Sequence, residues 1–383
     1  MAGNTYGSSF RITTFGESHG KVNGVVMDGL PSGLMVNEKE MSDDLILRKP
    51  GKKYSTKRNE DDIPEIISGI FNGKTTGAPL TIIFHNMDVE SSYYERNRFF
   101  PRPGHADLPA MIKYGYDNWD FRGGGRLSAR ETVSRVVAGS VARKLLLLKG
   151  IVVAGCVSSL GDMEFGMVSL EDCLSSRRRE LRTPSDSYEK IAEGLLQKII
   201  SENDSVGGSV QIIVRGVPAG LGEPVFDKLK ANIAYAMLGI PGSTYFEMGD
   251  GLKQSHSRGS EMMDKIVNRD GKYSWVKNHS GGILGGIATG DDIFFRIGFK
   301  PTSSIPRVHD TVDIRSGSAV EIKIVGRHDP SIVPRAVAVA ESMACILILD
   351  QLMLSGEFRK PITDDENRIM NELWKTYQRV ESK

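Results

Sequence analysis

The stretch SARETVSRVVAGSVARKLLLLKG, residues 128–150, carries the clearest secondary-structure signal in the chain. Its apolar residues recur at helical spacing. Ser128 and Glu131 have the S-x-x-E spacing of a capping box, and Gly150 supplies a residue type that commonly ends a helix. The stretch therefore predicts a long helix.

Strand patterns lie on both sides of this helix. DIFFRIGFK at 292–300 and AVEIKIVG at 319–326 alternate apolar residues, as half-buried antiparallel strands do. Because strands and helices mix without strict alternation, the sequence favours an α+β fold over a doubly wound sheet. The expected strands are 22–27, 65–71, 80–85, 151–157, 209–216, 293–300 and 319–325, and the other expected helices are 37–47, 186–200, 226–238 and one from about 330 past 350.

No low-complexity linker or fixed-period repeat divides the sequence, so we expect one domain over residues 1–383. The basic stretch RRRELRTPSDSYEK, residues 177–190, is expected to be a solvated surface excursion. The most apolar segment, residues 332–354, contains Arg335, Glu341 and Asp350. Charges at those depths disfavour a membrane span, so we expect a buried core or interface helix.

The overall charge and the cysteines narrow the classes of function. A formal net charge of +1 gives no global field that would recruit nucleic acid or an anionic membrane. Cys156, Cys173 and Cys345 are widely spaced without a C-x-x-C pair, which argues against a disulfide framework and a zinc site. The N-terminal residues lack the apolar run of a signal peptide. A cytoplasmic protein is the simplest expectation.

Cationic residues gather in loops of the first third of the chain, at KPGKKYSTKR (49–58), around PGHAD (103–107) and in FRGGGRLSARE (121–131). For many of these lysines, a solvated surface position is as good an explanation as ligand binding. The three glycines between Arg122 and Arg126 would let backbone approach a ligand closely, and the helix start after them favours anions. Guanidinium groups suit carboxylate and phosphate. Together these features indicate a small polyanionic ligand.

Several common sites are disfavoured by spacing. RGGGR is not a P-loop, and GGILGG (281–286) does not match a dinucleotide-binding fingerprint. GGILGG is open to two interpretations, a backbone surface for a flat ring or a tight turn. The pairs His105 with Asp107 and His328 with Asp329 lack H-x-x-x-H spacing and have arginines beside them, so we expect no metal.

FGESHG, residues 15–20, raises a sharper question, because His19 is either a catalytic acid or a polar residue in a glycine-rich turn. The neighbouring Ser18 does not decide it, since adjacent side chains rarely point at one another. Within the set of motifs described next, the functional interpretation of His19 is favoured.

GESHG…DGLPSG, RPGHAD, FRGGGRLSARET, GGILGG, FKPTSSI and GRHDP occur in an order and spacing that resembles the bacterial, FMN-dependent chorismate synthases. The resemblance extends from about residue 3 to residue 354. It implies a β-α-β sandwich with antiparallel sheets and packed helices, and a homotetramer.

The resemblance also implies a reaction, the anti 1,4-elimination of phosphate from 5-enolpyruvylshikimate 3-phosphate to give chorismate, the last common step towards the aromatic amino acids. Reduced FMN is required although no net oxidation occurs, and NADPH would act as reductant through a separate reductase. The substrate's two carboxylates and phosphate would explain the cationic loops. An FMN-dependent reductase with net redox turnover is the alternative, and the missing dinucleotide fingerprint counts modestly against it.

Functional residues of the family transfer to this sequence motif by motif. His19 resembles the histidine that protonates the departing phosphate, His105 the one that protonates reduced flavin, and Asp329 the carboxylate that assists hydrogen removal. Arg48 and Lys53 match basic positions for substrate or a nicotinamide phosphate, with Lys53 where arginine is usual. The expected FMN contacts are Arg126, Leu127, Ser128, Pro241, Gly242, Gly285, Lys300, Pro301, Thr302, Ser303, Ser304 and Arg327.

The sequence departs from the family pattern at three places. Leu127 stands where serine is usual, which removes a hydroxyl. Pro241 and Gly242 occupy an Asn-Ala site, and Thr244 stands where lysine is common. These departures affect the expected FMN segment and leave His19, His105 and Asp329 intact.

Overall fold

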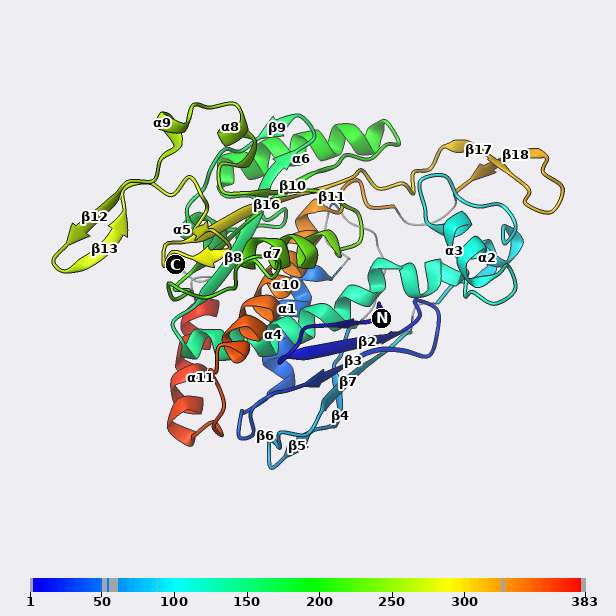
Figure 1. Ribbon diagram of the computed structural model, residues 1–383. Coiled ribbons are helices and arrows are strands. Elements are labelled where there is room, and N and C mark those ends of the chain that lie inside the picture. The colour runs from blue at the N-terminus through cyan, green and yellow to red at the C-terminus, as the bar shows by residue number, and fades with distance from the viewer. Residues whose placement is uncertain (1–2, 50–53, 55–60, 88, 325–327, 380–383) are drawn as a thin grey trace.

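The computed structural model describes residues 3–49, 54, 61–87, 89–324 and 328–379. Two five-stranded sheets lie on either side of a layer of helices (Figure 1). This arrangement confirms the predicted α+β class and the β-α-β sandwich. One cluster of buried apolar side chains extends from Phe10, beside the first sheet, to Met370 near the C-terminus.

The first sheet is antiparallel and is built from the N-terminal part of the chain, in the strand order β1-β2-β3-β7-β4. Thr13 pairs with Val26, and Val25 pairs with Ile82. Alternation along the strands puts Val25, Ile82 and Phe84 in the core, where they are fully buried. Its strands are β1 (Thr5–Tyr6), β2 (Arg11–Gly16), β3 (Val22–Asp28), β4 (Glu65–Ser68) and β7 (Leu80–His85).

The second sheet is also antiparallel and has the order β11-β16-β10-β8-β9. Ile212 lies between Phe295 on one neighbouring strand and Gly155 on the other. A Cβ on Gly155 would lie 2.4 Å from Cδ1 of Ile212, so this position needs glycine for close packing. Its strands are β8 (Val152–Leu160), β9 (Met163–Glu164), β10 (Gly208–Arg215), β11 (Ser243–Met248) and β16 (Ile293–Phe299).

Two long helices, α4 (Thr132–Leu148) and α10 (Val333–Leu354), form the centre of the middle layer. They pack against each other, while α4 contacts β3 of the first sheet and α10 contacts β8 and β10 of the second. A Cβ on Gly139 would lie 2.3 Å from Cβ of Ser342, so the glycine allows the two helices to approach closely. The helices α1 (Glu38–Arg48) and α7 (Leu229–Leu238) also pack on α10.

Helix α10 is the only described helix long and apolar enough to cross a membrane, and 89% of its most apolar window is buried inside the protein. Its charged residues have defined partners there. Asp350 accepts hydrogen bonds from the backbone N–H groups of Ser8, Ser9 and Phe10, which fixes the N-terminal segment against the helix. The prediction of a core helix is confirmed.

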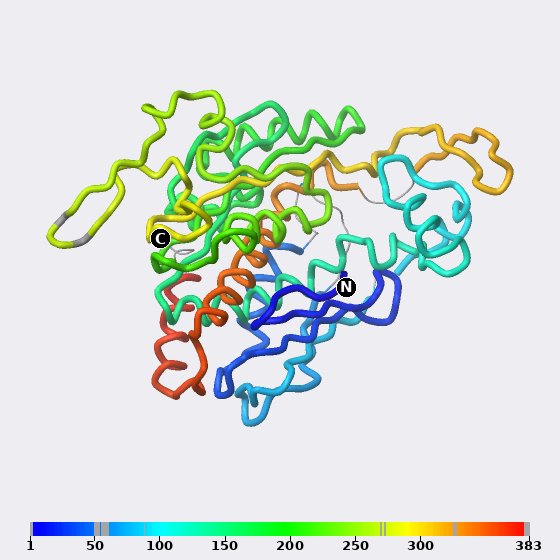
Figure 2. The backbone as a smooth tube through the Cα atoms, viewed as in Figure 1, coloured from blue at the N-terminus to red at the C-terminus, as the bar shows by residue number. Residues whose placement is uncertain are grey.

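The remaining elements lie outside the two five-stranded sheets, and most of them are short. The hairpins β12–β13 and β17–β18 extend from opposite ends of the molecule (Figure 2). These elements are β5 (Ile70–Phe71), β6 (Lys74–Thr75), β12 (Ile266–Arg269), β13 (Lys272–Trp275), β14 (Ile283–Leu284), β15 (Ile287–Ala288), β17 (Val308–Val312), β18 (Ala319–Lys323), α2 (Ser92–Arg96), α3 (Asp107–Tyr114), α5 (Leu170–Ser175), α6 (Asp186–Ser201), α8 (Gly251–Ser255), α9 (Gly259–Met262), α11 (Asp364–Arg379) and the 3-10 turns Arg122–Leu127, Ala129–Glu131 and Ser176–Arg178.

Two predicted helix starts are wrong. Ser128 caps the short turn Ala129–Glu131 by accepting from the backbone N–H of Arg130, and Glu131 pairs with Arg135 at 2.9 Å, so the expected reciprocal capping box is replaced. The helix expected over 226–238 begins only at Leu229, because Leu229 is fully buried whereas Phe226 is 96% exposed and has little to pack against.

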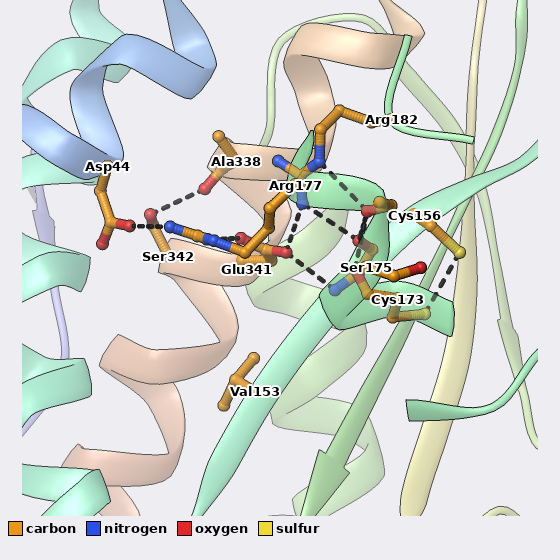
Figure 3. A network of polar contacts seen from close by, with 12 residues as sticks. Asp44, Val153, Cys156, Cys173, Ser175, Arg177, Arg182, Ala338, Glu341 and Ser342 are labelled. Carbon is orange, nitrogen blue, oxygen red and sulfur yellow. Dashed lines mark hydrogen bonds and ion pairs between the residues drawn. The ribbon is translucent and has the colours of Figure 1, made fainter. Parts of the chain in front are cut away.

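The basic stretch 177–190 is not a solvated excursion throughout, which corrects the sequence-based expectation. The side chains of Arg177 and Arg182 are buried and point towards Glu341 on α10 (Figure 3). Arg182 donates to Glu341 at 2.8 Å, and Arg177 donates to Asp44 of α1 at 2.9 Å. Arg143 of α4 completes this buried charge network by contacting both carboxylates. The local sequence gives no sign of this burial, because the carboxylate partners Asp44 and Glu341 lie on the distant helices α1 and α10.

Candidate functional site

A cavity of about 1020 Å³ opens at one end of the sandwich. Its wall combines the start of the first sheet, the 3-10 turns before α4, the end of α7 and the loop after β16. Thirteen of the residues expected to be functional line it: His19, His105, Arg126, Leu127, Ser128, Pro241, Gly242, Lys300, Pro301, Thr302, Ser303, Ser304 and Asp329.

Four expected residues do not join this set. Arg48 is buried outside the cavity lining, and Gly285 lies in the turn between β14 and β15 with a φ of +64°. That backbone conformation favours the tight-turn interpretation of GGILGG over a surface for a flat ring. Lys53 and Arg327 lie outside the described residues.

Arg48 belongs to a buried group of charges beneath the site. Its guanidinium group donates to Asp62 at 3.0 Å and to the hydroxyl of Thr132 at 2.8 Å. Asp62 is shared with Arg130. Burial lowers the pKa of Arg48 to about 10, although the Asp62 charge opposes that shift. This geometry gives Arg48 a role in holding the structure below the cavity.

The His19 ring is fixed by residues from two other segments. Its Nδ1 lies 2.9 Å from the hydroxyl of Ser91, and the ring meets Tyr94 edge to face, with centroids 5.3 Å apart. A Cβ on Gly123, whose φ is +58°, would lie 2.4 Å from Nε2 of His19. The first glycine of RGGGR therefore makes room for the histidine ring, whereas the sequence had suggested room for a ligand.

Both ring nitrogens of His105 form hydrogen bonds. Nδ1 lies 3.0 Å from the carbonyl oxygen of Pro103, which requires an N–H at Nδ1, and Nε2 lies 2.8 Å from the hydroxyl of Ser304. Burial, assisted by the Arg102 charge, lowers the pKa of His105. The ring is therefore poised as a neutral imidazole that accepts from Ser304.

Asp329 lies at the entrance to α10. Its carboxylate accepts from Nη1 of Arg335 at 2.6 Å, and Nε of the same arginine donates to the backbone carbonyl of Arg48 at 2.9 Å. Arg335 thus orients the carboxylate and joins it to the buried charges around Arg48.

Polar groups suited to an anion also line the cavity, at Lys300–Ser303 beside the His105 loop and at Arg126. Nζ of Lys300 lies 2.6 Å from the carbonyl oxygen of Gly104 and 3.0 Å from the hydroxyl of Ser303. Arg126 binds Thr14 and Asn4 through two of its nitrogens, while its Nη1 is buried without a hydrogen-bond partner. The buried hydroxyl of Thr302 is likewise unpartnered.

The cavity also has an apolar side. Leu127 is 46% exposed, and Ile240 and Ile332 contribute further aliphatic surface. Tyr235 stacks on Tyr6 with ring centroids 5.9 Å apart. Such a combination of apolar walls and a few convergent polar groups is typical of cofactor and substrate pockets.

Sequence reasoning missed several of these residues. Tyr94, Arg135 and Tyr235 line the cavity, and Ser91 contacts His19 from outside the lining. Arg102, which also lines the cavity, directly precedes the stretch PGHAD (103–107), whose surrounding cationic residues are its signal in the sequence. Ser91 and Tyr94 belong to the short segment around α2, and Arg135 and Tyr235 lie on α4 and α7, where nothing in the local pattern marks them as cavity residues. Among the described residues, no group of three or more His, Cys, Asp or Glu side chains is placed to hold a metal.

Comparison with known proteins gives a consistent result. Residues 10–353 match a family model described as "Chorismate synthase". The chain is 50% identical over 379 residues to a chorismate synthase of Sulfurisphaera tokodaii, covering 98% of this chain and 97% of the relative. It is 48% identical over 381 residues to one of Sulfolobus acidocaldarius, with 98% and 97% covered. A solved structure titled "Crystal Structure of Chorismate Synthase" is 27% identical, with a TM-score of 0.73 over 99% of this chain and 100% of that one.

Proposed function

Since this chain belongs to the chorismate synthase family, a family of lyases, we propose that the cavity is the site where 5-enolpyruvylshikimate 3-phosphate loses phosphate to give chorismate. The observation that carries the proposal is that the three expected catalytic residues lie around the same cavity. His19, His105 and Asp329 come from three segments far apart in sequence and line one cavity.

The residues present fit reduced FMN beside the substrate. A volume of about 1020 Å³ is at the upper end for small-molecule sites, as two ligands in contact would require. The unpartnered Nη1 of Arg126 and hydroxyl of Thr302 would bond phosphate oxygens, with Lys300 supplying charge. The aliphatic side formed by Leu127 and Ile332 suits a flat ring.

The departures from the usual FMN segment are compatible with this fit. Leu127 loses a hydroxyl but exposes an apolar surface to the cavity. Gly242 adopts a φ of +84°, and its carbonyl oxygen accepts from the backbone N–H of Lys300 at 3.0 Å. The Pro241–Gly242 pair therefore shapes the cavity wall through its backbone.

His19 is the proposed proton donor to the departing phosphate. In the imidazolium form, Nδ1–H donates to Ser91 and Nε2–H is the donor at the Gly123 side of the cavity. A phosphate there would stabilise the protonated ring, because a neighbouring anion raises the pKa of a histidine. Proton delivery of this kind typically contributes about 10²–10⁴-fold to a rate.

His105 and Asp329 are proposed to act at the flavin side. Reduced FMN, when bound, would supply an electron to the substrate and take one back with the C6 hydrogen, so that no net oxidation would result. His105 would hold a proton at Nε2 once an anionic ligand offsets the effect of burial on its pKa. Asp329, oriented by Arg335, would accept a proton at its carboxylate.

The proposal is tested by anaerobic assay with photoreduced FMN and the purified substrate. Chorismate and inorganic phosphate should appear in equal amounts. The His19→Ala variant should lower kcat by at least about a hundredfold, as loss of a general acid does. His85→Ala is the matched control, because His85 pairs with Glu65 at an exposed site on the first sheet and should leave kcat unchanged. Equal activity of the two variants would contradict the assignment of His19.

Three further properties belong to the proposal. NADPH would reduce the flavin through a separate reductase, so the purified chain should not oxidise NADPH with free FMN. The chain would assemble as a homotetramer, which sedimentation equilibrium measures directly. It would act in the cytoplasm.

A further inference from the structure

Two cysteines that are 17 residues apart in sequence lie in contact between the second sheet and helix α5. Sγ of Cys156, on β8, lies 3.2 Å from Sγ of Cys173, on α5 (Figure 3). Both side chains are fully buried. A disulfide has an S–S length of about 2.05 Å, so a relative movement of about 1 Å would bring the sulfurs to bonding distance.

The pair lies in a part of the core that is separate from the main cluster. Five buried residues, Ala154, Cys156, Leu170, Cys173 and Ile213, form this small cluster. Helix α5 has only six residues, and a helix so short depends on packing for its stability. A covalent bond at this point would therefore fix an element that has little apolar surface of its own.

The same region supplies the arginines of the buried charge network. Directly after α5, the hydroxyl of Ser176 donates to the carbonyl oxygen of Gly155 at 3.0 Å, and Arg182 donates to the same oxygen at 3.1 Å. Gly155 is the residue before Cys156. Figure 3 shows the sulfur pair on one side of Ser175 and Glu341 on the other, with Arg177 and Arg182 reaching Glu341. A link between β8 and α5 would hold the start of this segment in place.

We propose that Cys156 and Cys173 are a cross-linking site and form a disulfide that ties α5 to β8. Two S–H bonds break and one S–S bond forms. The two electrons and two protons pass to a disulfide-bearing oxidant, which is reduced to two thiols by thiol–disulfide exchange.

The bond forms while α5 is still undocked. In the folded chain the thiols are shielded from solvent, and the hydrogen bond with Cys156 together with burial raises the pKa of Cys173. A buried thiol with a raised pKa reacts slowly, because the thiolate is the attacking species. The same burial protects the finished bond from reductants.

Cys345 provides an internal control. It is fully buried in α10, and burial raises its pKa to about 12. It should remain a thiol under conditions that link the other two.

The test begins with reduced, denatured full-length protein that is refolded in a buffer of oxidised and reduced glutathione. The sample is quenched with acid, denatured and treated with N-ethylmaleimide, and the intact mass is measured. We expect one alkylated cysteine in the unmodified sequence, none in Cys345→Ser and two in Cys156→Ser. Three alkylated cysteines, or glutathione attached to Cys156 or Cys173 in place of the cross-link, would overturn the proposal.

A second measurement tests what the bond does. The oxidised protein should have a Tm a few degrees above that of the same sample reduced with a phosphine, since a cross-link restricts the unfolded chain. Cys345→Ser should retain this difference, and Cys173→Ser should abolish it. Equal Tm values for the oxidised and reduced unmodified protein would contradict a linking role.

Discussion

At the scale of single residues, the position of His19 depends on a serine that touches no other part of the proposed chemistry. Ser91 stands at the N-cap of α2, yet its side chain makes no cap hydrogen bond there. Its hydroxyl instead lies 2.9 Å from Nδ1 of His19. We infer that Ser91 is a positioning residue that keeps Nε2 as the donor nitrogen of the protonated ring.

Replacing Ser91 therefore tests this arrangement. Ser91→Ala should lower kcat by up to about tenfold, the cost of one ordinary hydrogen bond, while KM for the substrate changes little. Ser91→Thr keeps the hydroxyl and should recover most of the activity. The alkaline limb of the pH–rate profile, along which the proton-donating His19 loses its proton, should shift in Ser91→Ala alone. If alanine and threonine at this position behave alike, the serine has no positioning role.

His105 gives a pH dependence of stability. Its pKa is lowered below the ordinary value of 6.5, chiefly by burial, so the unfolded chain binds more protons than the folded one just below pH 6.5. The stability contributed by neutral His105 is complete above that pH and is lost as the pH falls towards the lowered pKa.

The measurement compares the Tm of the unmodified protein and of His105→Gln between about pH 7 and pH 5. The fall in Tm on acidification should be smaller in the variant. His328, whose pKa burial also lowers, is present in both proteins and so cancels in the comparison. If the two curves of Tm against pH run parallel, His105 does not contribute to the pH dependence of stability.

Sequence alone could predict which residue types belong to the site but not how they are held. His19, His105 and Asp329 stand in short motifs, and the structure brings all three to one cavity. The contact between His19 and Ser91 spans 72 residues, and nothing in the local pattern marks it. The purpose of Gly123 was misread for the same reason, since the ring it accommodates comes from a distant loop.

At the scale of elements, the helix layer is held by the buried charge network. Glu341 of α10 accepts from Arg182 at 2.8 Å and from the backbone N–H of Gly155 at 2.8 Å. Arg143 and Arg177 lie 3.4 Å from its other oxygen. The surrounding arginines lower the pKa of this carboxyl group although burial opposes them.

Removing the negative charge of Glu341 should destabilise the fold. Glu341→Gln should lower the free energy of unfolding by about 3–5 kcal/mol, because buried guanidinium groups lose their counter-charge. Glu357→Gln is the control, since Glu357 pairs with Lys149 at the surface and such pairs contribute about 0–1 kcal/mol. Urea unfolding measures both values. Equal losses in the two variants would show that the network does not stabilise the fold.

A local capping signal predicted the start of one helix correctly. Asn37 caps α1 by accepting from the backbone N–H of Lys39, as the sequence indicated. Helix α11 is not among the expected helices, although its start carries a capping signal. Thr363 and Glu366 form reciprocal hydrogen bonds between side chain and backbone there. The buried arginines after α5 had no local signal, since their partners lie on α1 and α10.

At the scale of the whole molecule, the two sheets enclose the helix layer and leave the cavity at one end. The mixed order of strands and helices predicted the α+β class, and the family resemblance supplied the sandwich. Composition could not predict the cavity, because its walls combine loops with parts of β2, α4 and α7 that are far apart in sequence. The central claim is that these loops bind reduced flavin as a catalyst that is returned unchanged.

The most direct test counts turnovers for each flavin reduced. Substrate in large excess over photoreduced FMN is added anaerobically to the purified chain, and chorismate and the flavin spectrum are followed together. We expect many molecules of chorismate for each FMN, with the flavin still reduced at the end. One chorismate for each FMN, with the flavin oxidised in step, would contradict the account and favour a reductase with net redox turnover.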